Sequence, residues 1–144
     1  MKALPLVLDT NIVLDVFVFA DEAARPLRPA LEAGRLRWLA TTAMREELAR
    51  VLAYPQIVPR LAYYQLAAQD VLAAFDRHAE CVDAPPKVPL TCSDPDDQKF
   101  IDLAVARQAW LLSKDRAVLS MRKRLAAWSV QALPALPAHT LEIA

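Results

Sequence analysis

Glycine is nearly absent from this chain of 144 residues, which contains a single one, Gly34, beside eleven prolines. Loops that bind nucleotide phosphates need several glycines, because the backbone itself must approach the phosphate closely. The shortage therefore argues against the common nucleotide-binding loops and the dinucleotide-binding fingerprint.

Cysteines and long apolar runs are also scarce. Cys81 and Cys92 are too few for a disulfide framework, and neither has a Cys or His at zinc-finger spacing, so we expect two free, buried thiols. The apolar part of the amino-terminal MKALPLVLDTN is too short for a signal peptide, and no apolar run approaches the roughly 18 residues of a membrane span. We expect a cytoplasmic protein without membrane contact.

The net charge is zero, because 17 basic side chains balance 17 acidic ones, so no overall field attracts nucleic acid. The basic residues are nevertheless unevenly distributed, and residues 116–141 contain four of them and no acid. Both a solvated surface and a rim that contacts phosphates are compatible with this distribution. The candidate RNA-binding residues in this segment are Arg116, Arg122, Lys123 and Arg124.

A chain of this length can bury one core but is too short for two ordinary domains, so we expect a single domain, residues 1–144. Short apolar runs predict strands at residues 4–8, 35–40, 110–112 and 128–132. Periodic patterns and caps predict helices at residues 12–19, 24–33, 42–54, 60–79, 95–108 and 115–125. This alternation predicts an α/β fold: a three-layer α/β/α sandwich with a central parallel sheet of about four or five strands.

The tryptophans and histidines have ordinary structural explanations. Trp38, Trp110 and Trp128 all fall in expected strands, which favours core packing over base stacking. His78 and His139 lie far from the acidic segments and have no Ser or Cys partner for a nucleophilic triad. We expect both histidines to be structural or exposed.

Acidic side chains follow several of the expected strands. Asp9 ends the first strand, Asp115 follows the third, and Glu47 lies in the helix after the second. Asp97 lies in the first turn of the helix that begins at Pro95. Because ligands of parallel sheets bind beyond the carboxyl ends of the strands, we expect these four acids to lie at one edge.

Helical geometry distinguishes between neighbouring acids, because successive residues are about 100° apart around the axis. In the helix after the second strand, Glu47 lies at the border of the apolar face, whereas Glu46 faces water. In the helix that begins at Pro95, Asp97 points inward and Asp102 points outward.

Carboxylates that converge repel one another and are costly to bury unless a cation balances them. Ligands that offer only oxygen favour Mg²⁺ or Mn²⁺ over zinc. Such a site activates water and stabilises the leaving oxygen of a phosphodiester. Each acid taken alone is explained as well by a helix cap or a solvated surface. The four together favour metal-dependent hydrolysis of a nucleic-acid backbone.

In this order along the chain, the segments LDTNIVLD, EELARVLAYP, DPDDQKFIDLAVA and LLSKDRAVL resemble the PIN-domain ribonucleases, in particular the bacterial toxins of toxin–antitoxin pairs. The resemblance implies a PIN-like sandwich and an endoribonuclease that uses Mg²⁺ or Mn²⁺. It also implies a homodimer and a small cognate antitoxin protein that docks near the active site.

The resemblance further implies roles for single residues. The residues implied to be both catalytic and metal-binding are Asp9, Glu47, Asp97 and Asp115. Asn11 and Ser113 are implied to support the site. The family pattern leaves the register open, so Asp94 and Asp96 compete with Asp97, and Glu46 competes with Glu47.

Two other functions are weighed against nuclease activity. The first is a catalytically silent PIN-like module that binds RNA or a protein partner. The second is a haloacid-dehalogenase-like phosphatase with Asp9 as nucleophile, which is weakened because Asn11 stands where that mechanism expects a second Asp.

Overall fold

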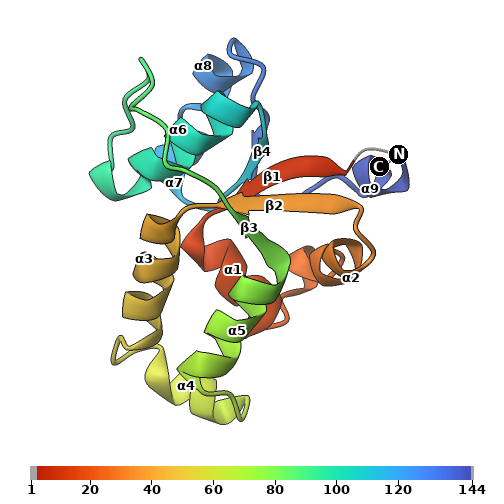
Figure 1. Ribbon diagram of the computed structural model, residues 1–144, viewed down its shortest axis with the longest axis vertical. Coiled ribbons are helices and arrows are strands. Elements are labelled where there is room, and N and C mark those ends of the chain that lie inside the picture. Colours follow the sequence, from red (N-terminus) through yellow and green to blue (C-terminus); the bar gives the residue numbers. More distant parts are fainter. Residues whose placement is uncertain (1–2, 144) are drawn as a thin grey trace.

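Parallel strands form the centre of the molecule, for which a computed structural model describes residues 3–143 and the side chains of residues 3–140 (Figure 1). The strands are β1 (Leu4–Leu8), β2 (Leu36–Ala40), β3 (Ala79–Cys81), β4 (Trp110–Leu112) and β5 (Ala132–Leu133). They pair in the order β3-β2-β1-β4-β5, and every pairing is parallel. The predicted α/β class and parallel sheet are therefore confirmed.

Helices cover both faces of the sheet. The chain before β4 forms α1 (Thr10–Phe17), η1 (Glu22–Ala24), α2 (Leu27–Glu32), α3 (Thr42–Leu52), α4 (Val58–Tyr63), α5 (Ala68–His78), η2 (Pro95–Asp97) and α6 (Gln98–Arg107). The chain after β4 forms α7 (Arg116–Leu119), α8 (Arg122–Ala126) and α9 (Ala138–Ile143). In Figure 1, α1 to α5 lie on one side of the sheet and α6 to α8 on the other, which gives the three predicted layers.

The core lies between these layers because the central strands are apolar on both sides. Leu6 and Val7 of β1 and Leu111 of β4 have no exposed surface, and Trp38 of β2 is 1% exposed. Continuous apolar runs of this kind are typical of parallel strands that are covered on both faces. The sheet order places β1 beside β4. Strands β2 and β3 continue the sheet beyond β1, and β5 continues it beyond β4. The crevice at that change of direction is where such sheets bind ligands.

The segment predicted as one helix at residues 60–79 is interrupted. Gln65, between α4 and α5, has a left-handed φ of 57°. The Leu66 N–H donates to the Leu61 carbonyl at 2.9 Å, as in helix ends that close on a left-handed residue. Apolar spacing continues across the break, so periodicity did not reveal it. The helix predicted at residues 115–125 is likewise divided into α7 and α8.

The fourth expected strand is shorter and starts later than predicted. It covers Ala132–Leu133 instead of residues 128–132, because Ser129 turns the chain with a left-handed φ of 64°. Trp128 precedes this turn and is 42% exposed, so the expectation of core packing is wrong for this residue. The expectation is confirmed for Trp38.

The short edge strand β3 was not expected from the sequence. It extends the sheet by pairing with β2, and two of its three residues, Glu80 and Cys81, are exposed. The expectation of buried thiols is therefore wrong for Cys81 and confirmed for Cys92. The formation of a three-residue strand depends more on pairing with its neighbour than on its own composition. The sequence of β3 therefore shows no recognisable strand pattern.

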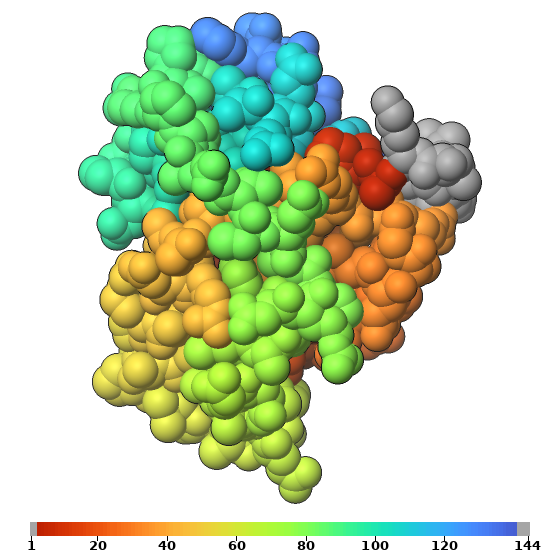
Figure 2. Space-filling view, in the orientation of Figure 1, coloured from red at the N-terminus to blue at the C-terminus, as the bar shows by residue number. Residues whose placement is uncertain are grey.

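A loop changes the environment of Asp102, which is buried, contrary to the expectation that it points into solvent. Its Oδ1 accepts hydrogen bonds from the Val88 N–H at 3.1 Å and from Gln98 Nε2 at 2.8 Å. Figure 2 shows the chain after β3, in green, crossing the surface from one helix layer to the other. Asp102 lies on the side of α6 that faces away from the sheet, but the loop that contains Val88 covers it.

Among residues 3–143, no helix is long and apolar enough to span a bilayer.

Candidate metal centre

The first acid of the site lies where β1 ends. Asp9 is 3% exposed, and its N–H donates to the carbonyl of Leu112 in β4 at 3.1 Å. Its Oδ1 accepts the Ile12 N–H at 3.1 Å and so caps α1. The carboxylate is therefore held at the carboxyl ends of two adjacent strands, at the change of direction in the sheet.

Ser113 connects two of the acids. It has no exposed surface, and its Oγ donates to Asp9 Oδ2 while accepting the Asp115 N–H at 3.0 Å. The Oδ1 of Asp115 accepts the Ala117 N–H at 2.9 Å and caps α7. This hydroxyl therefore orients the Asp9 carboxylate and the backbone at Asp115.

Three carboxylates converge beside this pair of strands. Asp94, Asp97 and Asp115 each place one carboxylate oxygen within 4.8 Å of the others. Asp94 caps η2 by accepting the Asp96 N–H at 3.0 Å, which leaves Asp96 exposed on the outside of the turn. Asp97 is 8% exposed, and its Oδ2 has no hydrogen-bond partner within the described part of the chain.

Among the described residues, no ion pair balances the charges of this cluster. Burial, together with the nearby carboxylates of Asp115, Asp94 and Asp9, raises the pKa of Asp97 to about 7. Burial also raises the pKa of Asp9, although the hydrogen bonds from Ser113 and the backbone lower it. A buried oxygen without a partner among repelling carboxylates suits a hard divalent cation, whose preferred ligands are oxygens. The residues present therefore fit Mg²⁺ or Mn²⁺.

Glu47 lies outside this cluster of three acids and already has a cationic partner. Its Oε1 accepts from Lys99 Nζ at 2.6 Å, and its Oε2 accepts from the Thr10 hydroxyl. Lys99 also donates to the backbone carbonyl of Asp96. Glu46 is exposed, so of the two neighbouring glutamates Glu47 is the one that faces the site.

A cavity of about 350 Å³ is lined in part by residues that neighbour Asp9 and Asp115 in the chain. Asn11 is exposed and lines it together with Asp15 and Lys114, which form an ion pair of 2.5 Å. On another wall, the Arg60 guanidinium lies 3.7 Å from the centroid of the Phe19 ring. Asn11 therefore borders the cavity and makes no side-chain hydrogen bond to Asp9 among the described residues.

The four basic residues expected to contact RNA are all exposed on α7 and α8. No ion pair involves them within the part of the chain that the structure describes. Arg116 directly follows Asp115 in the chain, so this basic surface begins beside the acidic cluster and continues on α8. The residues are Arg116, Arg122, Lys123 and Arg124.

Sequence reasoning missed two partners of the site, Thr10 and Lys99. Thr10 directly follows Asp9, so its position after a strand was a usable signal. Lys99 gave no such signal, because a Lys in the first turns of a helix is usually solvated and its reach to α3 depends on tertiary packing.

Comparison with known proteins identifies the family. No curated protein matches the chain. Among solved structures, VapBC2 from Rickettsia felis bound to a DNA fragment from their promoter contains a similar chain, with a TM-score of 0.59 and 14% identity. The match covers 90% of this chain and 98% of that chain, which shows a shared fold. The family model of the PIN domain matches residues 5–117, most of the chain. The protein belongs to the PIN-domain family.

Proposed function

We propose that the protein is an endoribonuclease that depends on Mg²⁺ or Mn²⁺. The observation that carries this proposal is the convergence of Asp94, Asp97 and Asp115, with one buried carboxylate oxygen that has no partner among the described residues. Burying such a group costs free energy that the folded protein alone does not offset, which is typical of a site built for a ligand.

Asp97 and Asp115 are the proposed central ligands, flanked by Asp94 on one side and Asp9 on the other. A bound Mg²⁺ or Mn²⁺ supplies the charge that neutralises the scissile phosphate and lowers the pKa of water. Ser113 keeps the Asp9 carboxylate in one orientation. Glu47 remains a proposed catalytic acid. Before substrate binds, Thr10 and Lys99 hold its carboxylate at the border of the site.

The substrate strand is proposed to enter between two surfaces. One is the exposed basic surface of α7 and α8, which begins at Arg116 next to Asp115 and offers guanidinium and ammonium groups that can contact phosphates. The other is the cavity that contains Asn11 and Lys114. Positioning by such groups contributes to catalysis by holding the phosphodiester in line with the attacking water.

The fold shared with a chain of VapBC2 supports a further proposal. We infer that the protein is the toxin of a toxin–antitoxin pair, that it forms a homodimer, and that a small antitoxin protein is its partner. A short open reading frame beside the gene for this chain, whose product copurifies with it and suppresses cleavage, is the expected result. Full activity in the presence of that product would contradict the assignment as a toxin.

The nuclease proposal is tested by incubating purified protein with labelled single-stranded RNA in Mn²⁺ or Mg²⁺. We expect internal cleavage that stops when a chelator is added. Asp97→Asn and Asp9→Asn should reduce the rate by at least about a hundredfold, whereas Asp83→Asn, at an exposed position, should not change it. RNA binding without cleavage would favour the silent binding module. An aspartyl phosphate formed at Asp9 from a phosphomonoester would favour the phosphatase.

A further inference from the structure

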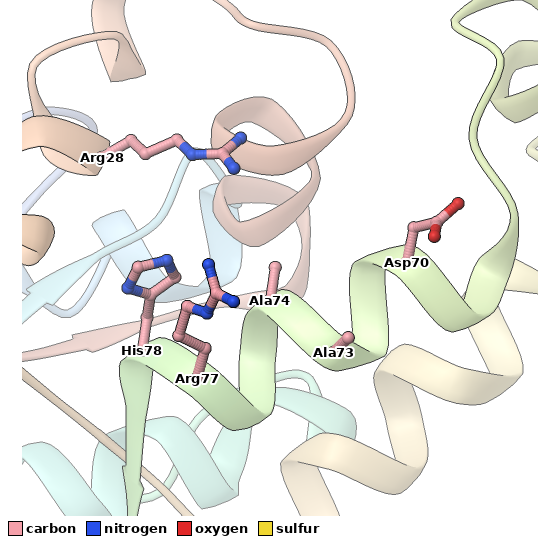
Figure 3. Close-up of a pocket in the computed structure, with 6 residues that line it drawn as sticks. All are labelled: Arg28, Asp70, Ala73, Ala74, Arg77 and His78. Carbon is pink, nitrogen blue, oxygen red and sulfur yellow. The ribbon is translucent and has the colours of Figure 1, made fainter.

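A second polar cavity lies at the opposite edge of the sheet. It has a volume of about 230 Å³, and its walls carry Arg28 of α2 and Arg77 and His78 at the end of α5 (Figure 3). His78 directly precedes β3, so this cavity lies toward the amino ends of the parallel strands. The acidic cluster follows the carboxyl ends. The two sites are therefore separate.

Aromatic packing holds two of these side chains in place. The Phe17 ring, which is buried at the end of α1, stacks on the His78 ring with a centroid distance of 5.6 Å. The Arg28 guanidinium lies 5.3 Å from the centroid of the same Phe17 ring. In Figure 3, Arg28 stands on one side of the cavity and faces Arg77 and His78 on the other. The Phe17 ring thus helps to position the His78 imidazole and the Arg28 guanidinium at the cavity before any ligand binds.

The two arginines lack carboxylate partners. Within the described residues, neither Arg28 nor Arg77 forms an ion pair. Asp70 lines the far end of the cavity, about two helical turns from Arg77. It accepts the Ala67 N–H at 2.8 Å and so serves the start of α5. Unpaired guanidinium groups that face one another repel, and an anion between them removes that repulsion.

We propose that this cavity binds a phosphate group, held by the guanidinium groups of Arg28 and Arg77 and by the imidazole of His78. Each guanidinium can donate two parallel hydrogen bonds to neighbouring oxygens. A tetrahedral phosphate directs its oxygens to more than one side and can therefore accept from two guanidinium groups that face each other, whereas the two oxygens of a carboxylate lie in one plane and point to the same side. The phosphate can belong to a nucleic-acid backbone or to a small free phosphate ester.

Binding should depend on pH through His78. Burial lowers the pKa of His78, as do Arg28 and Arg77, and Glu32 of α2 opposes them. A bound phosphate adds negative charge beside the ring and raises this pKa. Because binding and protonation are linked, phosphate should bind more tightly as the pH falls through the range in which His78 takes up its proton.

Histidine ring resonances in NMR spectra give a direct measurement, since the chain has only His78 and His139. The experiment uses the full chain in chelator, so the acidic cluster holds no metal and repels anions. Inorganic phosphate is expected to raise the pKa of His78 and to leave that of the exposed His139 unchanged. Equal responses of the two rings would overturn the proposal.

Variants identify the groups that bind. Arg28→Met and Arg77→Met keep much of the side-chain volume and should each weaken phosphate binding by at least about tenfold. Arg77→Lys keeps the charge but loses the planar group, so an intermediate loss is expected. Arg50→Met, at an exposed position on α3, is the matched control and should leave binding unchanged. Equal affinity in the control and in both cavity variants would contradict the proposal. Circular dichroism checks that each variant is folded.

Three probes distinguish the sources of the phosphate: inorganic phosphate, adenosine monophosphate and a single-stranded oligonucleotide. If only the oligonucleotide depends on Arg28 and Arg77, the cavity binds a nucleic-acid backbone; if the small probes depend on them, it binds free phosphate groups. Affinities that are independent of both arginines for all three probes would overturn the proposal. Because no probe is cleaved in chelator, this result is independent of the proposed ribonuclease activity.

Discussion

Asp97 carries an electrostatic cost in the acidic cluster, because burial and three neighbouring carboxylates raise its pKa from 3.8 to about 7. A raised pKa means that the folded, metal-free protein favours the protonated form. The stability that this proton contributes is complete below about pH 4 and is lost as the pH rises through 7.

Asp97→Asn should remove this dependence, since the amide stays neutral. In chelator at pH 8, we expect the variant to be more stable than the parent by about 1–2 kcal/mol, a value reduced for screening by water. The two proteins should become similar near pH 4. Urea unfolding at several pH values measures this, with the exposed Asp83→Asn as control. Parallel stability curves for Asp97→Asn and the parent would refute the electrostatic account.

Ser113 is the second residue whose contribution is measurable by itself. Ser113→Ala removes the donor to Asp9 and the acceptor for the Asp115 N–H in a site without exposed surface. The free energy of unfolding should fall by about 1–3 kcal/mol. The exposed Ser120→Ala, which loses one hydrogen bond to the Ala117 carbonyl, should stay within about 0.5 kcal/mol. Equal losses in the two alanine variants would contradict the role of Ser113.

At the scale of elements, the loop before η2 depends on α6. Gln98 accepts the Cys92 N–H at 2.7 Å and donates to the Leu90 carbonyl and to Asp102, each at 2.8 Å. Asp102 in turn accepts the Val88 N–H. The loop that precedes Asp94 is therefore held in place by the side chains of Gln98 and Asp102, both on α6.

Asp102→Ala should loosen this loop, and it retains all three acids of the cluster. We expect faster hydrogen exchange at the Val88 amide and a loss of about 1–3 kcal/mol in stability, because partly buried donors lose their acceptor. The effect on the strands should be small. Hydrogen exchange followed by mass spectrometry locates the change, and Asp83→Ala is the exposed control. Unaltered exchange over residues 84–91 would show that Asp102 does not anchor the loop.

At the scale of the whole molecule, metal binding should stabilise the fold, since the three carboxylates meet only in the native state. A ligand at about a hundred times its dissociation constant adds about 2.7 kcal/mol to the free energy of unfolding. We expect Mn²⁺ to raise the melting temperature and chelator to reverse the rise. The double variant Asp97→Asn with Asp115→Asn should not respond. A rise that persists in this variant would place the metal elsewhere.

Local chemistry made much of this protein predictable. The buried strands β1, β2 and β4 appear as continuous apolar runs. Asp9 after β1 and Asp115 after β4 are joined through Ser113 because parallel strands end at one edge. Asp9 and Asp115 cap the helices that they precede, as their positions in the sequence indicated. The inward position of Asp97 was likewise readable from helical spacing.

Tertiary structure alone decided the remaining features. Helical geometry favoured Asp97, but the convergence of Asp94 with it depends on how the preceding loop is fastened to α6. The pairing of Glu47 with Lys99 joins residues 52 positions apart. The burial of Asp102 and the existence of β3 both arise because another segment covers or pairs with them. The sequence by itself determined which acids follow buried strands, because that depends on neighbours along the chain. Which of these acids share one site was decided by contacts between distant segments, which only the packed fold brings together.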